Sequence, residues 1–223
     1  MTLTYRKVAL IGILSIGFLG GCLGSQPEEE LYVAFENAAN QEKTLFDNVN
    51  KLEQLETKGQ ELYDQIVQEG KEHNEAVIPK IEQAVTNVDE REKVLESEKD
   101  VLEKAQKETT SVHSYIDKIE DEKLQKQAKK VGEVYKNRYE VFQKMDKICK
   151  ESLITEKELY EKLKDKEINL KEISEKVKAV NTLNKETLKE KAKFNQYTKD
   201  YNEGKLRFYK DAKIKIKEQK QEY

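Results

Sequence analysis

The sequence predicts an all-α protein, folded as an elongated up-and-down bundle of long helices. Nine Gly and two Pro are spread over 223 residues, so the residues that punctuate strands and tight turns are scarce. Charged residues make up 38% of the chain, a fraction that by itself would favour disorder. The apolar residues nevertheless recur mostly at steps of three, four or seven, which is the spacing of one helix face.

Four stretches of the chain carry this helical spacing. Each is about 40–50 residues long, or ~60–75 Å as a helix, and short connections separate them. Similar lengths and short connections predict four antiparallel neighbours, with three longer helices as the alternative. None of these amphipathic helices can bury its own apolar face, so they must pack on one another. The stretches span residues 31–66, 77–119, 124–163 and 170–209.

Local signals mark the boundaries between these helices. Pro79 is tolerated in a first helical turn, which places a helix start just before it. Counting sevens along the second stretch leads to Lys123 rather than Leu124, and this slip predicts a turn near residues 120–123. In the sequence INLKEI, Asn169 and Glu172 form a capping box in which the Asn169 side chain accepts from the amide of Glu172.

Several predicted core positions hold polar residues. Arg91 and Arg138 occupy positions of the apolar face, where they set the helix register or pair with Glu98 or another acid across the bundle. Cys149 also lies on the apolar face of the third stretch. We expect Cys149 to be a small buried core residue rather than a reactive thiol.

The N-terminus has the features of a secretory signal. Arg6 and Lys7 precede an apolar segment at residues 8–19, and small residues follow it. This segment is shorter than the roughly 20 apolar residues of an ordinary transmembrane helix. A signal peptide therefore explains the N-terminus better than a membrane-spanning helix.

The sequence LGGC at residues 19–22 resembles the lipobox of bacterial lipoproteins, in which an aliphatic and two small residues precede a cysteine. The resemblance implies cleavage between Gly21 and Cys22 and a diacylglycerol thioether on Cys22. Buried acyl chains contribute ~0.8 kcal/mol per CH₂ and hold a soluble domain on a membrane. The alternative is a transmembrane anchor with an incidental Cys. We expect a signal peptide at 1–21, a lipidated cysteine and polar tether at 22–30, and a helical bundle domain at 31–223.

Composition and motifs argue against several function classes. Removing residues 1–21 takes away two basic residues and no acid, which moves the net charge from −3 to −5. Nucleic-acid binding needs a positive bias, so we expect no nucleic-acid partner. The sequence contains no HExxH, GxSxG or phosphate-binding glycine loop, and His73 and His113 have no partner at ligand spacing. We therefore expect no enzyme activity, no metal and no cofactor.

One stretch near the C-terminus is rich in aromatic and amide residues. The sequence FNQYTKDYNEGKLRFYK, residues 194–210, combines side chains that often grip sugars. The alternative is that these aromatics fill the bundle core, since Tyr197 and Tyr201 are four residues apart. The candidate binding residues are Tyr197, Tyr201, Asn202, Tyr209, Lys210 and Lys213.

The C-terminal quarter of the chain is basic, with 17 basic and 11 acidic residues in 164–223. An even number of antiparallel helices returns the C-terminus to the end where the first helix starts, and Cys22 ties that end to the membrane. We therefore expect the basic tail, residues 205–223, to lie near anionic lipid head groups or anionic polymer. The alternative is a solvated helix end whose lysines suit the helix dipole.

The lipobox, the lysine- and glutamate-rich helices and the sequences YKNRYEVF, EKELYEKLKDKE and FNQYTKDYNEGKLRFYK together resemble the YkyA-type family of cell-wall-binding lipoproteins of Bacillus and related Gram-positive bacteria. The resemblance covers essentially the whole mature chain. It implies a helical bundle anchored on the outer face of the cytoplasmic membrane, within the wall. It brings no catalytic residues, and Cys22 is the residue to which it assigns a role.

Together these observations predict a non-enzymatic, lipid-anchored surface protein that binds cell-wall polymer or an envelope protein. The alternative is a structural spacer or scaffold with no glycan site. Solvent-exposed Tyr and Asn residues on the fourth helix would favour the binder, and buried ones would favour the spacer. Neither reading defines the oligomeric state.

Overall fold

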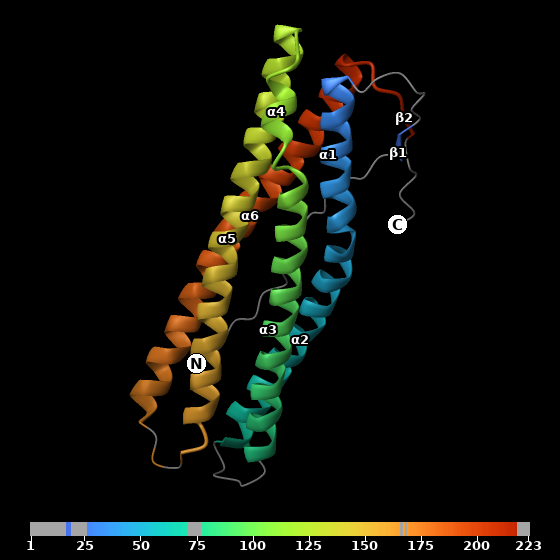
Figure 1. The fold of residues 1–223 in the computed structure, drawn as a ribbon. Helices are drawn as coiled ribbons and strands as arrows, with labels where there is room; N and C mark the ends of the chain where they lie inside the picture. The colour runs from blue at the N-terminus through green and yellow to red at the C-terminus, as the bar shows by residue number, and fades with distance from the viewer. Residues whose placement is uncertain (1–16, 19–25, 71–76, 166, 168, 218–223) are drawn as a thin grey trace. The chain divides into compact units, whose positions relative to one another are not determined.

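The structure is a computed structural model that describes residues 17–18, 26–70, 77–165, 167 and 169–217. Cys22 and the predicted cleavage site lie outside the described residues. A two-residue antiparallel pair joins β1 to β2, and the other described elements are helical, which confirms the all-α prediction (Figure 1). The elements are β1 Gly17–Phe18, α1 Pro27–Gln41, the 3₁₀ helix η1 Glu42–Thr44, α2 Leu45–Gly70, α3 Val77–Glu108, α4 Val112–Ile116, α5 Glu122–Lys162, α6 Leu170–Asp211 and β2 Ile216–Lys217.

These helices form the four predicted segments, and the three-helix alternative is wrong. The first segment is α1–η1–α2, the second is α3 with α4, and α5 and α6 are the third and fourth. The turn expected near residues 120–123 lies just before α5, where Asp121 Oδ1 accepts from the amide of Leu124 at 2.9 Å. Pro79 lies in the first turn of α3, as expected.

The first helix begins earlier than the apolar spacing indicated. Pro27 is its first residue, so residues 27–30 of the expected tether are helical. Proline suits this position because its missing N–H would have no partner there. Three glutamates follow it in the first turn, where the helix dipole favours negative charge.

Two other helix ends differ in detail from the prediction. Asn169 does cap α6, but its Oδ1 accepts from the amide of Lys171 at 2.8 Å rather than from that of Glu172. Glu172 instead pairs with Lys162 at 2.7 Å. The second segment is broken after Glu108, where the hydroxyls of Thr109 and Thr110 donate to carbonyls three residues back and compete with helical hydrogen bonding.

The chain forms two compact units. Among the described residues, unit 1 contains those within 47–98 and 142–192, whereas unit 2 contains 17–18, 26–46, 99–141 and 193–217. The long helices α3, α5 and α6 each contribute one part to each unit. Each unit therefore draws on all four helical segments.

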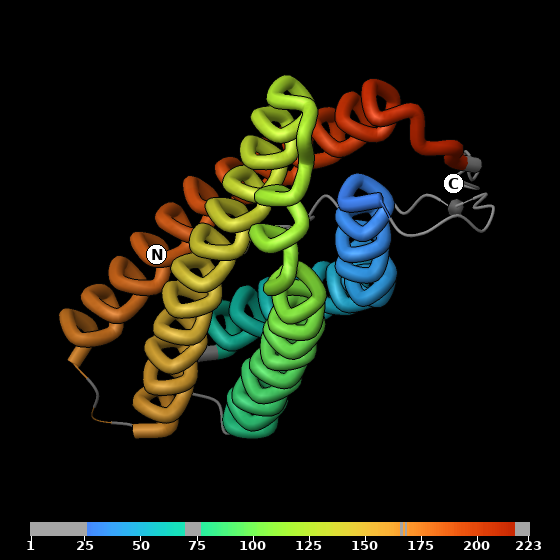
Figure 2. Tube along the Cα trace, turned by 45° about the horizontal axis from the view of Figure 1, so that its top comes forward, coloured from blue at the N-terminus to red at the C-terminus, as the bar shows by residue number. Residues whose placement is uncertain are grey.

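Within unit 1 the paired residues run in opposite directions along neighbouring helices. Asn48 of α2 donates to Ser97 of α3, whereas Asn87 of α3 donates to the carbonyl of Leu55 further along α2. Figures 1 and 2 show the C-terminal half of α5 alongside the N-terminal half of α6. Reversed pairing joins these two halves as well, through Lys144 with Glu190, Ser152 with Asn184, and Glu158 with Lys176.

Unit 2 shows the same antiparallel packing. Phe35 of α1 makes an edge-to-face contact with Tyr201 of α6, and Tyr32, one turn earlier, contacts Tyr209, which lies further along α6. The end of the last helix therefore packs on the start of the first, as the topology argument predicted. Within the described residues, no helix combines the length and apolar character that crossing a membrane requires.

Most predicted apolar positions are buried, several are half-buried, and two on α6 are exposed. Leu170 is 77% exposed because it is the first residue of the helix, directly after the Asn169 cap. Leu206 is exposed because it lies five residues after Tyr201 and so points away from the buried face. Lys205, at the helical spacing of four, takes the buried position instead.

Candidate functional site

The structure buries three of the side chains that the sequence offered as a binding surface. Tyr201 and Tyr209 have no exposed surface, and Asn202 is 8% exposed. Buried rings cannot stack on a sugar, so this placement favours the core-packing alternative. Of the other three candidates, Tyr197 is half-buried, and Lys210 and Lys213 are exposed.

A carboxylate on α1 organises these buried aromatics in unit 2. Glu36 Oε1 accepts from the Tyr209 hydroxyl at 2.9 Å and lies 2.8 Å from Lys205 Nζ. Burial lowers the pKa of Lys205, and the neighbouring Glu36 carboxylate opposes that shift. Lys205 has no exposed surface, so it belongs to the core and adds nothing to the basic tail in which the sequence placed it.

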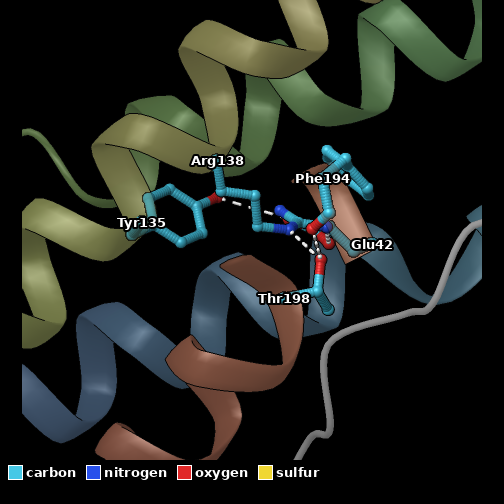
Figure 3. Close-up of polar contacts among 5 residues, drawn as sticks. All are labelled: Glu42, Tyr135, Arg138, Phe194 and Thr198. Atoms are coloured by element: carbon cyan, nitrogen blue, oxygen red, sulfur yellow. Dashed lines mark hydrogen bonds and ion pairs between the residues drawn. The ribbon is translucent and has the colours of Figure 1, made fainter. Parts of the chain in front are cut away.

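A second buried ion pair, which we call the Arg138 centre, lies in the same unit and consists of Glu42, Tyr135, Arg138, Phe194 and Thr198 (Figure 3). Arg138 donates to both carboxylate oxygens of Glu42, at 2.8 and 2.7 Å. Its Nε donates to the Thr198 hydroxyl at 2.7 Å, and that hydroxyl donates to the carbonyl of Phe194 at 2.8 Å. The guanidinium also lies 4.2 Å from the centre of the Phe194 ring.

The Arg138 centre is saturated with partners. Tyr135 donates its hydroxyl to Glu42 at 3.3 Å, and burial next to this carboxylate raises the pKa of Tyr135 well above its ordinary value. Arg138 is 1% exposed, so no solvent competes for its donors. A site so closed and so well paired fixes how η1, α5 and α6 fit together and leaves no group with which to bind a ligand.

Unit 1 holds a different arrangement around the other buried arginine. Arg91 pairs with Glu156 of α5 at 2.5 Å and donates through its Nε to Asn87 at 3.1 Å. The expected partner Glu98 therefore does not receive this charge. Glu98 is 2% exposed, and its Oε1 has no hydrogen-bond partner among the described residues.

Glu98 lines a cavity of about 60 Å³, which we call the Glu98 cavity. Leucine side chains and Met145 supply its apolar wall. The polar wall holds a second carboxyl, that of Glu56 on α2, whose Oε2 also lacks a described partner. Two acceptor oxygens from different helices thus share one small cavity. Its other polar lining residues are Arg91, Cys149, Ser152, Asn184 and Thr187.

Burial changes the protonation of both carboxyls. It raises the pKa of Glu98 to about 8, with a further contribution from the neighbouring charges of Glu56 and Asp146. Burial likewise raises the pKa of Glu56 to about 8, against the opposing attraction of Arg91 and Lys191. Both groups are therefore largely neutral at pH 7 and become charged in the mildly alkaline range.

Cys149 borders the same cavity. Its Sγ lies 3.7 Å from the hydroxyl of Thr187, and burial raises the pKa of the thiol to about 12. A thiol with so high a pKa is a poor nucleophile at neutral pH, which agrees with the expectation of an unreactive thiol, while the residue is half-buried rather than fully buried. Among the described residues, no group of three or more His, Cys, Asp or Glu is arranged to hold a metal ion.

Four exposed cations of unit 2 lie in the last turns of α6 and just after it. We call Arg207, Lys210, Lys213 and Lys215 the basic end; all four are exposed, and none forms an ion pair with a described residue. The chain leaves α6 at Asp211, and Lys213 adopts a φ of 57°, in the left-handed region. This turn carries the last two cations past the helix end.

Sequence reasoning missed the partners rather than the positions of the buried charges. Glu42 lies four residues after Ala38 and three before Leu45, both on the predicted apolar face. Glu56 likewise follows Leu52 by four residues. An acid in a core position was therefore a usable signal for both carboxylates, although it does not say which cation each one meets.

Comparisons with known proteins agree with this architecture. A family model described as YkyA, "Putative cell-wall binding lipoprotein", matches residues 26–211. A curated relative, "Uncharacterized lipoprotein YkyA" of Bacillus subtilis (strain 168), is 28% identical over 199 residues, which cover 89% of each chain. No solved structure matches this chain. The match spans every helix described above, and the chain belongs to the YkyA family of lipoproteins.

Proposed function

We propose that this protein is anchored through Cys22 on the outer face of the cytoplasmic membrane and binds an anionic polymer of the cell wall through its basic end. The proposal involves no catalysis. The observation that carries it is the exposure of four cations on one short stretch, Arg207 to Lys215, without an ion pair to a described residue. The aromatic residues nearby are buried, so charge rather than ring stacking is the available means of binding.

The fold supports this placement of the basic end. Tyr209 packs on Tyr32 with ring centroids 4.8 Å apart, and Tyr32 is ten residues after Cys22 in the sequence. A tether this short would keep the basic end close to the membrane. Each cation near an anionic surface contributes about 1 kcal/mol, and salt screens the attraction.

A spacer or scaffold role is the second candidate, and one observation favours it. The burial of Tyr201, Tyr209 and Asn202 is what we expected of a protein whose helices pack without a glycan site. The spacer makes the opposite prediction about the basic end, because its cations would then be ordinary solvated side chains.

A wall pull-down separates the two candidates. Soluble residues 23–223 are mixed with purified wall that either retains or lacks its anionic polymers. The quadruple variant R207Q/K210Q/K213Q/K215Q should bind the complete wall at least tenfold more weakly than the wild type at low salt. This difference should vanish near 1 M salt. Deleting residues 205–223 would be a poorer test, because it also removes buried Lys205, Phe208 and Tyr209.

A matched control is available on the same helix. Lys171, Lys178, Lys185 and Lys189 are also exposed on α6, and replacing these four by Gln changes the net charge equally. This control should bind as the wild type does. An equal loss of wall binding in both variants would show that binding depends on net charge rather than on the basic end. Equal binding by all three proteins would favour the spacer role.

The anchor has its own test. Cys22→Ala should abolish fatty-acid labelling in cells and leave uncleaved precursor, because no other cysteine lies beside the predicted signal. Labelling that persists in this variant would remove the lipid anchor from the proposal.

A further inference from the structure

Two carboxyl groups that line the Glu98 cavity each have an oxygen without a hydrogen-bond partner among the described residues. These oxygens are Glu98 Oε1 and Glu56 Oε2. The nearest strong donor, Arg91, is engaged with Glu156 and Asn87. The Ser152 hydroxyl is likewise engaged, because it donates to Asn184 at 2.9 Å. A buried acceptor without a donor costs free energy, so the cavity favours an occupant that donates.

Size limits this occupant to a very small group. A volume of about 60 Å³ corresponds to roughly two water molecules at about 30 Å³ each. A sugar ring or a peptide segment would not fit. Leu52, Leu95 and Met145 form an apolar wall beside the polar lining, which suits a ligand with a short apolar part.

Charge distinguishes between the donors that fit. Arg91 and Glu156 neutralise each other, so the remaining carboxyls of Glu56 and Glu98 give the cavity a negative character whenever either is ionised. We propose that the Glu98 cavity binds a primary ammonium group, either a small free ammonium ion or the terminal group of an amine carried by a larger molecule. Such a group donates up to three hydrogen bonds and brings the compensating charge.

Two other occupants fit less well. A water molecule donates at most two hydrogen bonds and brings no charge, so it suits the protonated carboxyls but leaves an ionised one uncompensated. A metal ion would need more ligands, and the described residues provide no suitable group of three or more His, Cys, Asp or Glu. The ammonium group satisfies both the missing donors and the charge.

Binding of the cation is linked to loss of a proton. The carboxyl that meets the ammonium must be ionised, whereas burial keeps it mostly protonated at pH 7. Asp146 repels a second negative charge on Glu98, and Lys191 favours one on Glu56. The titratable and charged groups around the two carboxyls are Glu53 on α2, Arg91 on α3, Asp146, Cys149 and Glu156 on α5, and Lys191 on α6.

The test uses the full-length chain in mild detergent with methylammonium chloride as the probe, because methylammonium has two heavy atoms. Calorimetry in buffers of different ionisation enthalpy gives both the affinity and the number of protons released. We expect proton release below pH 8 and an apparent Kd that falls about tenfold per pH unit between pH 6 and 7.5. Glu98→Gln should weaken binding at least tenfold, and Glu56→Gln provides a second variant.

Controls isolate the site and the chemistry. Glu96→Gln removes an exposed carboxyl two residues away on α3 and should bind as the wild type does. Tetramethylammonium has the same charge but no N–H donor and should not bind. A lysine blocked at its amino and carboxyl ends tests where the ammonium group comes from. If it binds, an amine on a larger molecule can reach the cavity. If it does not bind although methylammonium does, the ligand is a free ion.

The proposal is overturned by any of three results. These are no heat of binding from methylammonium up to pH 9, equal binding by Glu98→Gln and Glu56→Gln when both remain helical by circular dichroism, and equal binding of tetramethylammonium. None of these outcomes bears on wall binding by the basic end, so the two proposals fail separately.

Discussion

The Arg138 centre and the Glu98 cavity begin from the same sequence feature, an arginine in a core position of a long helix. Arg138 meets both oxygens of one carboxylate and donates to a hydroxyl, so the guanidinium and its carboxylate are paired with each other. Arg91 meets Glu156, and two further acids, Glu56 and Glu98, are left beside it with oxygens that have no described partner. One region is closed by its charges, and the other keeps a cavity.

This difference shows that the number of buried acids beside an arginine distinguishes a closed ion pair from a candidate binding site. A single acid per arginine gives a locked contact, because the charges cancel and the geometry is bidentate. Additional acids in the same low-dielectric space cannot all be compensated, so they stay protonated at neutral pH and ionise readily only when a cation compensates them. The cost of the second arrangement makes it the better candidate for function.

The largest expected effect comes from breaking the locked contact. Arg138→Met leaves Glu42 buried without its partner and should lower the free energy of unfolding by about 3–5 kcal/mol, measured by urea denaturation. Arg207→Met, at an exposed arginine, should change it by less than about 0.5 kcal/mol.

A second variant tests the reason for that loss. Arg138→Met combined with Glu42→Gln removes both charges and should recover a large part of the stability. If the double variant is as unstable as the single one, packing of the arginine stem rather than the stranded charge explains the effect.

The next effect is a pH dependence assigned to the Glu98 cavity. Folding raises the pKa of Glu98 from 4.5 to about 8, so the folded state binds more protons than the unfolded state between these values. The free energy of unfolding should therefore fall as pH rises through this window, by about 1.4 kcal/mol per pH unit for one such group. Glu98→Gln should remove the contribution of Glu98 to that slope and leave the contribution of Glu56, whose pKa is also raised to about 8, as measured by urea denaturation from pH 5 to 8.

The comparison with Arg138 sharpens this measurement. Arg138 lies outside the cavity. Arg138→Met should therefore lower the free energy of unfolding at every pH without removing the slope due to Glu98. A wild-type protein whose stability stays flat or rises between pH 5 and 8, relative to Glu98→Gln, would contradict the raised pKa.

The smallest effect concerns two tyrosines of unit 2. Tyr209 donates to Glu36, whereas the Tyr201 hydroxyl is buried with no partner in the described part of the chain. Tyr209→Phe should cost about 1.5–3 kcal/mol, because it removes a hydrogen bond to a charged group. Tyr201→Phe should be neutral or slightly stabilising, and a matching loss at both positions would show that a partner for Tyr201 has been overlooked.

Much of the fold follows from the spacing of apolar residues. The four segments and the turn before α5 were predictable because a helix that buries one face must repeat that face every three to four residues. The early start at Pro27 was harder, since its cause is capping and dipole chemistry rather than burial. Leu206 was misplaced because its type suggested burial, whereas the helical angle gave that position to Lys205.

The two polar centres were predictable only in part. The sequence places Arg91, Glu98 and Arg138 on core faces, which identifies them as groups that need partners. It does not give the register between helices, which decides that Arg91 of α3 meets Glu156 of α5. Glu98 lies seven residues from Arg91 on the same helix, so no shift between helices changes their separation. The same register brings Glu56 of α2 and Glu98 of α3 to one cavity. The structure is therefore needed to know that these two acids are neighbours.

Each unit is built from stretches that are far apart in the sequence, and this has a consequence for synthesis and export. Each unit needs a part of α6, the last helix to leave the ribosome, and the Glu36–Tyr209 hydrogen bond joins residues 173 positions apart. Contacts between such distant residues form slowly, because a long loop must close first. If the N-terminus is held at the membrane, neither core can form until nearly the entire chain has crossed. Until then the apolar faces of the helices are exposed, and chaperones or neighbouring lipid would have to cover them.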